Sequence, residues 1–323
     1  MFSYFKLNGK NKDAFTVAFY NLENLFDTTD DPKTLDDDFT PKGKKHWNTK
    51  RYKKKIQKLG SVITQLGTEK SFFSPALVGV VEVENDSVLT DLINSKELKN
   101  EHYDFVHYES PDERGIDVAL LYKKELFELI SSETFPLYLE DEYGNRDYTR
   151  DILLVTGNLN GERIHVVVNH WSSRRSGEDK GESKRIKAAE LATTIVNKIS
   201  SENSEAKIII MGDFNDDPTN TSVKEHLVNN SFYNPMESIL DKGKGTLRHH
   251  GKWHLFDQII LSKNFFDAEP TKHSFKYAEV FDKYFLQEWK GKYRGTPFRT
   301  FVGKRYQGGF SDHFPVYVYL KKN

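Results

Sequence analysis

The segment IIIMGDFNDD, residues 208–217, places polar side chains directly after a run of apolar residues. Gly212 allows a sharp backbone turn, and Asp213 and Asn215 follow it two residues apart. A carboxylate and a carboxamide in this position could bind a metal ion, orient a water molecule or cap the next helix. An ordinary capped turn explains this segment equally well, so other segments must decide.

Several further apolar runs contain or end in polar residues of the same kinds. These residues are Asn21 and Glu23, Glu82, Asn169 and His170, Asp257, and Ser311, Asp312 and His313. Each has an ordinary explanation, such as a paired core carboxylate or a strand-entry turn. The occurrence of such residues in so many apolar runs favours a single functional site that they share. Oxygen ligands without cysteine favour Mg²⁺, Mn²⁺ or Ca²⁺ and disfavour structural zinc. Histidines and aspartates there could serve metal-assisted hydrolysis of phosphate esters.

The sequence contains none of the common motifs for nucleophilic or nucleotide chemistry. It has no G-x-S-x-G elbow, no cysteine, no G-x-x-x-x-G-K-[ST] loop and no G-x-G-x-x-G fingerprint. Hydrolysis by an activated water molecule is the remaining interpretation.

Short runs rich in Val, Ile, Phe and Tyr predict the strands that must position these residues. They are FTVAFYNL, ALVGVVEVE, YDFVHY, DVALLY, IHVVVNHW, KIIIMGDFN, FDQIIL and HFPVYVYL. Helices are predicted at 48–67, 85–95 and 180–200, and GNLNGERI predicts a hairpin turn. The segment 276–309 is expected to be a long surface loop. Without a repeat or a linker, the pattern favours one α/β domain over residues 1–323, with two packed sheets and outer helices.

Composition limits the classes of function. The 323 residues have a formal net charge of −1 and no cysteine, which excludes disulfides and argues against an overall basic surface. The N-terminus lacks the apolar core of a signal peptide, and no apolar run is long enough for a membrane helix. We therefore expect a cytoplasmic protein, or a secreted one if a leader was removed, with no integral membrane segment and no obligate protein partner.

The ordered motifs NLE, VVEVEN, NHW, GDFN and SDHFP resemble the endonuclease/exonuclease/phosphatase family, which has the DNase I-like fold. GTLRHHGKWHLFDQIIL and the closing run RTFVGKRYQGGFSDHFPVYVYL resemble its bacterial members in particular. The resemblance implies a four-layered α/β sandwich of two packed mixed β-sheets flanked by helices. It also implies a metal-dependent phosphoesterase site at one edge.

The same resemblance implies roles for individual residues. Glu82 corresponds to the main metal-binding glutamate, with Asn21 and Asp312 beside the same Mg²⁺, Mn²⁺ or Ca²⁺ ion and Glu23 assisting a second metal. The implied catalytic residues are His170, Asp213, Asn215, Asp257 and His313. Asp213 would position or deprotonate water and Asn215 orient it. Asp257 would fix the His313 tautomer, and His170 would bind phosphate or protonate the leaving oxygen. Arg114, Arg150 and Asn169 are the expected substrate-binding residues.

The resemblance leaves the substrate open, and nucleic acid is our first hypothesis. The basic run KGKKHWNTKRYKKK, residues 42–55, could contact phosphates or be a solvated helix face. Tyr293, Phe298 and Tyr306, interleaved with Arg294, Arg299, Lys304 and Arg305, could stack on bases or anchor a loop. Val81 stands where many nucleases of the family have glutamine, which leaves the metal ligand intact but puts the substrate contacts inferred from nucleases in doubt.

Two alternatives remain from the sequence. One is a phosphatase of the inositol phosphatase kind, or a phospholipid phosphodiesterase of the sphingomyelinase kind, that uses the same site. The other is a binding protein with the same fold that has lost catalysis, although the complete set of site residues argues against it.

Overall fold

Two six-stranded sheets form the centre of the computed structural model, which describes residues 10–323 except 175–177, 229–230, 250 and 268. The first sheet has the order β15 (His273–Val280), β18 (Val316–Lys322), β1 (Ala14–Leu25), β2 (Leu77–Val83), β4 (Asp117–Lys123), β3 (Tyr103–His107). The second has the order β11 (Phe232–Tyr233), β14 (Asp257–Ser262), β10 (Lys207–Asp213), β9 (Glu162–His170), β8 (Ile152–Leu159), β5 (Phe127–Phe135). Both sheets are mixed, because β1 and β2 are parallel and β9 and β10 are parallel.

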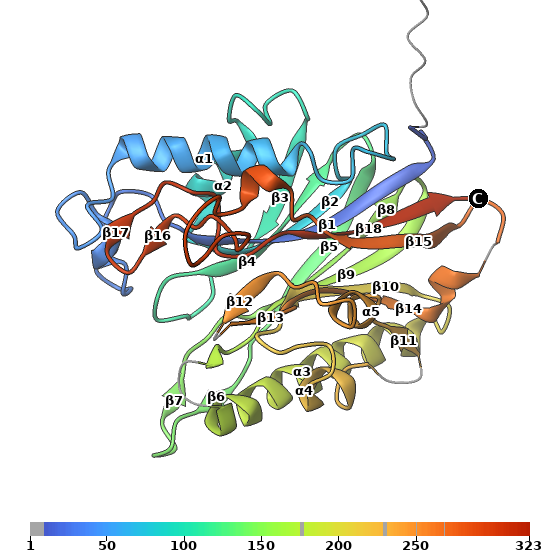
Figure 1. Cartoon of the computed structure of the whole chain (residues 1–323). Coiled ribbons are helices and arrows are strands. Elements are labelled where there is room, and N and C mark those ends of the chain that lie inside the picture. The colour runs from blue at the N-terminus through green and yellow to red at the C-terminus, as the bar shows by residue number, and fades with distance from the viewer. Residues whose placement is uncertain (1–9, 175–177, 229–230, 250, 268) are drawn as a thin grey trace, which may run out of the picture.

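Helices cover the outer faces of the two sheets (Figure 1). The first sheet carries α1 (Thr49–Ile63) and α2 (Asp86–Ile93), and the second carries α3 (Glu178–Glu202) and α4 (Thr221–Lys224). The short helix α5 (Met236–Leu240) contacts β14 and β15. The expected four-layered sandwich is confirmed.

Amphipathic patterning accounts for α1. Its side chains at Tyr52, Ile56, Leu59 and Ile63 are buried, as the spacing of three and four residues predicts. Asn48 caps the helix by accepting a hydrogen bond from the backbone N–H of Arg51. The sheets meet through apolar side chains, and Gly79 of β2 leaves room for the side chain of Met211 of β10. The strands that carry the polar residues are therefore held by an apolar core.

Short elements complete the chain. The two-stranded hairpins are β6 (Leu139–Glu140) with β7 (Arg146–Asp147), β12 (Leu247–His249) with β13 (Lys252–His254), and β16 (Phe301–Val302) with β17 (Arg305–Tyr306). The 3₁₀ turns are η1 (Asp37–Phe39), η3 (Lys263–Phe266) and η4 (Tyr284–Leu286).

Three parts of the fold differ from the prediction. The buried strand β8 was anticipated only through its turn into β9, and its run ILLV was not among the predicted strands. The expected loop at 276–309 begins inside an edge strand, β15, and contains η4 and the β16–β17 hairpin. The edge strand β5 was missed because its sequence FELISSETF is largely polar and exposed, so it shows no apolar run. In the described part of the chain, no helix is both long enough and apolar enough to cross a membrane.

Candidate active site

Strand register in the second sheet places three of the predicted side chains next to one another. Asp213 of β10 pairs with His170 of β9 on one side and with Asp257 of β14 on the other. Directly opposed residues on neighbouring strands point to the same face of a sheet. All three are buried, and Asp257 is 0% exposed. The site is thus built on a row of polar residues at one end of the second sheet.

The first sheet and the turn before β18 close the other side of this row. Asn21 of β1 donates a hydrogen bond from Nδ2 to Oδ2 of Asp213, at 3.0 Å. Ser311 donates to the carbonyl of Asn21 at 2.7 Å, and its hydroxyl accepts from the backbone N–H of His313 at 3.1 Å. Ser311 therefore fixes the turn that carries Asp312 and His313. Its position in the SDH motif was the sequence signal for this role.

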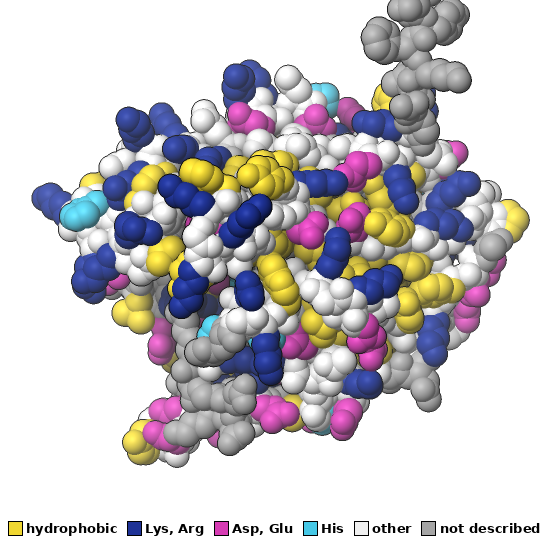
Figure 2. All heavy atoms as spheres, viewed as in Figure 1, with side chains coloured by type: hydrophobic (Ala, Val, Ile, Leu, Met, Phe, Trp, Pro, Cys, Tyr) yellow, Lys and Arg dark blue, Asp and Glu magenta, His cyan; other side chains and the backbone are white. Residues whose placement is uncertain are grey.

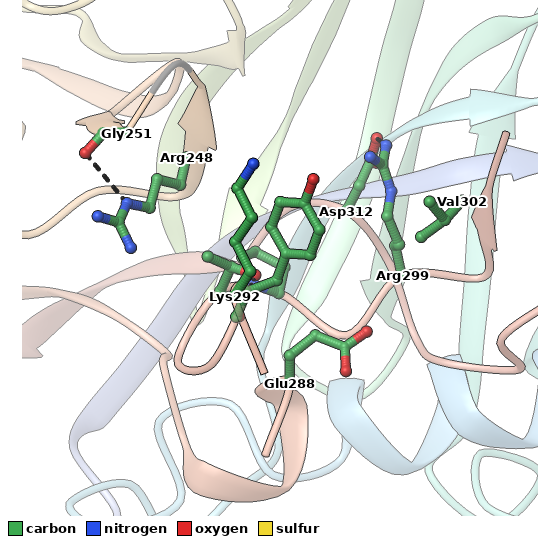
Figure 3. Close-up of a pocket in the computed structure, with 10 residues that line it drawn as sticks. Arg248, Gly251, Glu288, Lys292, Arg299, Val302 and Asp312 are labelled. Atoms are coloured by element: carbon green, nitrogen blue, oxygen red, sulfur yellow. Dashed lines mark hydrogen bonds and ion pairs between the residues drawn. The ribbon is translucent and has the colours of Figure 1, made fainter. Parts of the chain in front are cut away.

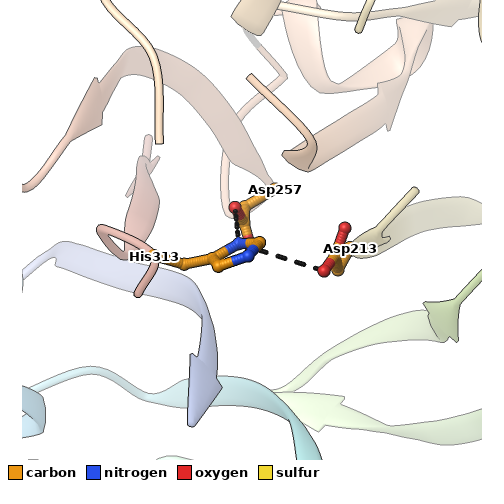
Figure 4. Close-up of side chains that lie close together, drawn as sticks. All are labelled: Asp213, Asp257 and His313. Carbon is orange, nitrogen blue, oxygen red and sulfur yellow. Dashed lines mark hydrogen bonds and ion pairs between the residues drawn. The ribbon is translucent and has the colours of Figure 1, made fainter. Parts of the chain in front are cut away.

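His313 lies between two aspartates (Figure 4). Its Nδ1 atom is 2.7 Å from Oδ2 of Asp257 and 3.9 Å from Oδ2 of Asp213. Although burial alone would lower it, the charges of Asp257 and then Asp213 raise the pKa of His313 well above its ordinary value. The ring is therefore an imidazolium at neutral pH, able to hold the negative charge of a phosphate.

Burial lowers the pKa of a histidine such as His313, but it has the opposite effect on Asp213, which lies beside that ring. It raises the pKa of Asp213 to about 6, while the charge of His313 opposes this shift. The Oδ1 atom of Asp213 accepts from the backbone N–H of Asn215 at 3.0 Å. Asp213 is thus held in position, with a pKa close to the range a general base uses.

His170 differs from His313 in its charge. Burial, followed by the charges of Arg150, Arg114 and His313, lowers the pKa of His170 well below its ordinary value. Its Nε2 atom is 3.9 Å from both Oε1 of Glu82 and Oδ2 of Asp213, and its Nδ1 atom is buried without a hydrogen-bond partner among the residues that the structure describes. A neutral imidazole suits hydrogen bonding to phosphate better than proton donation to a leaving oxygen, the other role expected for His170.

Glu82 sits on an irregularity in β2. The pairing of β2 with β1 and with β4 shifts register beside it, and its φ of 61° is in the left-handed region that non-glycine residues rarely adopt. Its Oε2 atom accepts from the backbone N–H of Asn24 at 2.8 Å. The bulge turns this carboxylate to the side where His170 lies, and the strain is typical of a functional site.

The chemistry of the donors fits a hard divalent cation. The metal ligands expected from the sequence, Asn21, Glu82 and Asp312, offer only oxygen atoms. Oε1 of Glu82 lies 3.9 Å from Nε2 of His170. Although burial would raise it, the charges of His313, Arg299 and Lys55 lower the pKa of Asp312, so this carboxylate is charged, and its Oδ2 atom accepts a hydrogen bond from Arg299 at 2.5 Å.

A second cluster of possible ligand atoms is Asp213, Asp257 and His313, which lie within 4.8 Å of one another. The hydrogen bond between Asp257 and His313 already occupies one nitrogen and one oxygen of this cluster. This bond holds the ring of His313 against Asp257.

Glu23 does not have the contacts expected of a ligand to a second metal. Its carboxylate accepts backbone hydrogen bonds from Thr300 at 2.6 Å and Phe301 at 3.3 Å. Burial, followed by the charge of Asp312, raises its pKa to about 7. Lys55 donates to the carbonyl of Glu23 at 2.5 Å and to the hydroxyl of Thr300 at 2.8 Å. Glu23 thus ties β1 to the C-terminal segment.

Asn169 does not have the contacts expected of a substrate-binding residue. It is fully buried, its amide donates to the carbonyls of Val167 and Met211, and its oxygen accepts from the indole of Trp171. These internal contacts use the whole side chain. Asn169 therefore positions Trp171, whose carbonyl accepts from Asn215 at 3.0 Å.

The two arginines expected at the substrate groove lie together beside His170. Arg150 donates to Asp112 at 2.8 Å and to the carbonyl of Trp171 at 2.7 Å, so it is fixed and buried. Arg114 contacts Asp112 at 3.6 Å and its side chain is 34% exposed. Arg114 is the more accessible of the two for an anionic substrate.

The basic run at 42–55 is used in part for packing, whereas Lys42, Lys44, Lys50, Lys53 and Lys54 are exposed. Lys45 donates to the carbonyl of Gly303 at 2.7 Å, and Arg51 lies over the ring of Tyr306 at 4.4 Å. Lys55 is 2% exposed and bonds to Thr300. These residues anchor the C-terminal segment to α1. Sequence patterning could not reveal this, because the partners lie more than two hundred residues away.

A sequence comparison identifies the family of the chain. Residues 16–322 match the sequence model of the endonuclease/exonuclease/phosphatase family. The chain belongs to this family. None of the curated proteins has a significantly similar sequence.

Solved structures of the family share the fold. The chain is similar to a family protein from Bacteroides thetaiotaomicron, with 17% identity, a TM-score of 0.59, and coverage of 96% of this chain and 95% of that one. A mannosyl-6-phosphatase from the same organism has 18% identity, a TM-score of 0.58, and coverage of 95% and 99%. TDP2 from D. rerio, complexed with a single-strand DNA product, has 14% identity, a TM-score of 0.57, and coverage of 96% and 99%. Family and neighbours together support a phosphoric ester hydrolase.

Proposed function

We propose that this protein is a divalent-metal-dependent phosphodiesterase that hydrolyses DNA or RNA by attack of water. The observation that carries the proposal is the ion pair of His313 with Asp257 beside Asp213, where Asn21 is bonded to Asp213 and Glu82 lies near His170. Positive and negative groups converge there as phosphoryl transfer to water requires. We also propose that residues 1–323 act as one domain, since both sheets supply site residues.

In this proposal each group has a separate task. Asn21, Glu82 and Asp312 would hold Mg²⁺ or Mn²⁺, with Ca²⁺ as a further possibility; when bound, the ion neutralises charge on the phosphate and on the leaving oxygen. Asp213 accepts the proton of the attacking water, whose position Asn215 helps to set.

The two histidines would act on the substrate rather than on the water. His313 holds the negative charge that develops on the phosphate, and its imidazolium form is kept by Asp257. His170 donates a neutral hydrogen bond to a phosphate oxygen.

Fewer observations support a nucleic-acid substrate than support hydrolysis of a phosphate ester. The fold is shared with a protein solved with a DNA product, and cations with exposed aromatic side chains lie near Asp312. A second candidate, hydrolysis of a compact phosphate monoester, is favoured by the fold shared with a mannosyl-6-phosphatase. Both candidates use the same residues, so substrate choice must be measured.

The test is hydrolysis of supercoiled plasmid, a single-stranded oligonucleotide, bis-p-nitrophenyl phosphate and p-nitrophenyl phosphate, with Mg²⁺, Mn²⁺ or EDTA. We expect EDTA-sensitive cleavage of the nucleic acids and of the small diester. Asp213→Asn and Glu82→Gln should each lower the rate about a hundredfold or more, the usual scale for one such group. Glu82→Gln should also raise the Mg²⁺ concentration needed for half-maximal activity.

Asp241→Asn is the matched control, because Asp241 is exposed and lies after α5. It should have the wild-type rate. Hydrolysis of the monoester alone would replace the nuclease proposal by the phosphatase candidate. A wild-type rate in Asp213→Asn, or full activity in EDTA, would overturn the proposed mechanism.

A further inference from the structure

A pocket with a volume of ≈ 660 Å³ opens beside Asp312. Arg248 of β12, Val302 of β16, and Glu288, Lys292 and Tyr293 of the segment between η4 and β16 line it (Figure 3). Its volume is in the range of pockets that hold a small organic ligand. Because Asp312 is a proposed metal ligand, a substrate bound there would extend from the reacting phosphate into this pocket.

Arg248 and Lys292 are the cations of the pocket available for an anion, whereas Arg299 is paired with Asp312 at 2.5 Å. Arg248 uses Nε to donate to the carbonyl of Gly251 at 3.1 Å. Its two terminal nitrogens point away from that carbonyl (Figure 3). Lys292 has no ion pair with any residue in the described ranges, and its Nζ lies 5.7 Å from the ring centre of Tyr293. On the face shown in Figure 2, Lys and Arg side chains gather around the hollow between the β16–β17 hairpin and β12.

Aromatic and acidic groups in the same pocket provide further contacts. The side chain of Tyr293 is 58% exposed, so its ring face can stack on a base. Glu288 forms no ion pair within the described part of the chain and can accept a hydrogen bond from an amino or hydroxyl group.

Other aromatic residues near the final motif are already used for packing. Phe298 contacts Phe310, and Tyr306 contacts Phe301 and the guanidinium of Arg51. Among the aromatic residues that the sequence suggested for stacking, Tyr293 is therefore the one left for a substrate.

From these contacts we propose that the pocket binds a nucleotide adjacent to the scissile phosphate, with its second phosphate on Arg248 and Lys292 and its base on Tyr293. This inference rests on the proposed phosphodiesterase function and specifies its substrate. The protein would then recognise two phosphates and one base. A simple aryl diester has only one phosphate and no base.

Binding of thymidine 3′,5′-bisphosphate, measured by calorimetry without metal, tests the pocket independently of catalysis. We expect Lys292→Glu to weaken binding about tenfold or more, because an attractive contact to phosphate becomes a repulsive one. Lys96→Glu is the matched control on the exposed connection between α2 and β3 and should bind as the wild type does. Equal binding by wild type and Lys292→Glu would overturn the inference, even if the enzyme proved to be a phosphodiesterase.

Hydrolysis then distinguishes a nucleotide from a sugar phosphate. The substrates are p-nitrophenyl phosphodiesters of thymidine with and without a second phosphate, and the same compounds with an abasic sugar. The second phosphate should lower KM about tenfold in wild type and not in Lys292→Glu. The base should lower KM in wild type and not in Tyr293→Leu.

A benefit from the second phosphate without one from the base would overturn the nucleotide assignment in favour of a sugar phosphate. A lack of hydrolysis of every diester, with intact binding of the bisphosphate, would contradict the proposed function and leave the pocket assignment standing.

Discussion

At the scale of single residues, the site contains two histidines with opposite charge states. The carboxylates of Asp257 and Asp213 keep His313 protonated, whereas burial and neighbouring cations keep His170 neutral. Groups whose pKa values are pushed apart by their surroundings commonly divide the work of catalysis. The charge of His313 therefore depends chiefly on Asp257, its closest partner.

Asp257→Asn tests this dependence. Because the variant removes the negative charge beside Nδ1, the pKa of His313 should fall. The imidazolium is then lost at lower pH, so the alkaline limb of kcat/KM for the small diester should move to lower pH. His313→Ala should lack this limb. A pH profile for Asp257→Asn that superimposes on that of wild type would contradict the assignment.

At the scale of secondary-structure elements, close packing of β9 against β10 sets the site. A Cβ atom at Gly212 would lie 2.4 Å from the carbonyl oxygen of Asn169, which belongs to the backbone and cannot move alone. These two residues pair directly, one position before the pair His170 and Asp213. Gly212 is therefore needed for the close approach of β9 and β10, and not only for the turn after β10.

Gly212→Ala should separate these strands. We expect a loss of about 1–3 kcal/mol in the free energy of unfolding, as for other overpacked interiors, and a lower kcat. Gly144→Ala, in the exposed β6–β7 hairpin where a Cβ meets no atom within 4 Å, should lose only about 1 kcal/mol through its φ of +80° and keep full activity. Urea denaturation and kcat of both variants decide the matter. Wild-type stability and turnover in Gly212→Ala would refute the packing argument.

At the scale of the whole molecule, a buried polar cluster joins the two sheets. Glu162, where β9 begins, accepts from the ring and the backbone N–H of His273 on β15 at 2.6 and 2.5 Å, and lies 3.2 Å from Lys207. Although burial would raise it, these contacts lower the pKa of Glu162 to about 2. The cluster is at the opposite end of β9 from His170, so it stabilises the sandwich without contacting the site.

The lowered pKa gives this stabilisation a defined pH dependence. It is fully present above the ordinary glutamate pKa of 4.5 and is lost as the pH falls towards about 2. Glu162→Gln should therefore lower the free energy of unfolding by about 3 kcal/mol at pH 7 and by much less near pH 2. Urea denaturation at both pH values, with the exposed Glu140→Gln as control, checks this. An equal loss at both pH values would point to packing instead of charge.

The apolar runs and the types of polar residue at their ends were sufficient to predict most of the architecture. Eight strands and the helices α1, α2 and α3 were predicted at or near their positions, because a buried strand or an amphipathic helix must show its period in the sequence. Asp213, Asp257, His313 and Asn21 were grouped on the same basis, and the structure places them together. The exposed edge strand β5 was missed because solvent removes that constraint.

Tertiary structure alone decided what each of these groups contacts. Glu23 and Lys55 anchor the C-terminal segment and Asn169 supports Trp171, whereas the sequence suggested roles at metal, phosphate or substrate. The opposite charges of His170 and His313 likewise depend on desolvation and on partners from other strands. Sequence specifies which side chains are present and which face they share, but pKa values and hydrogen bonds depend on distances of a few ångström between segments far apart in the chain.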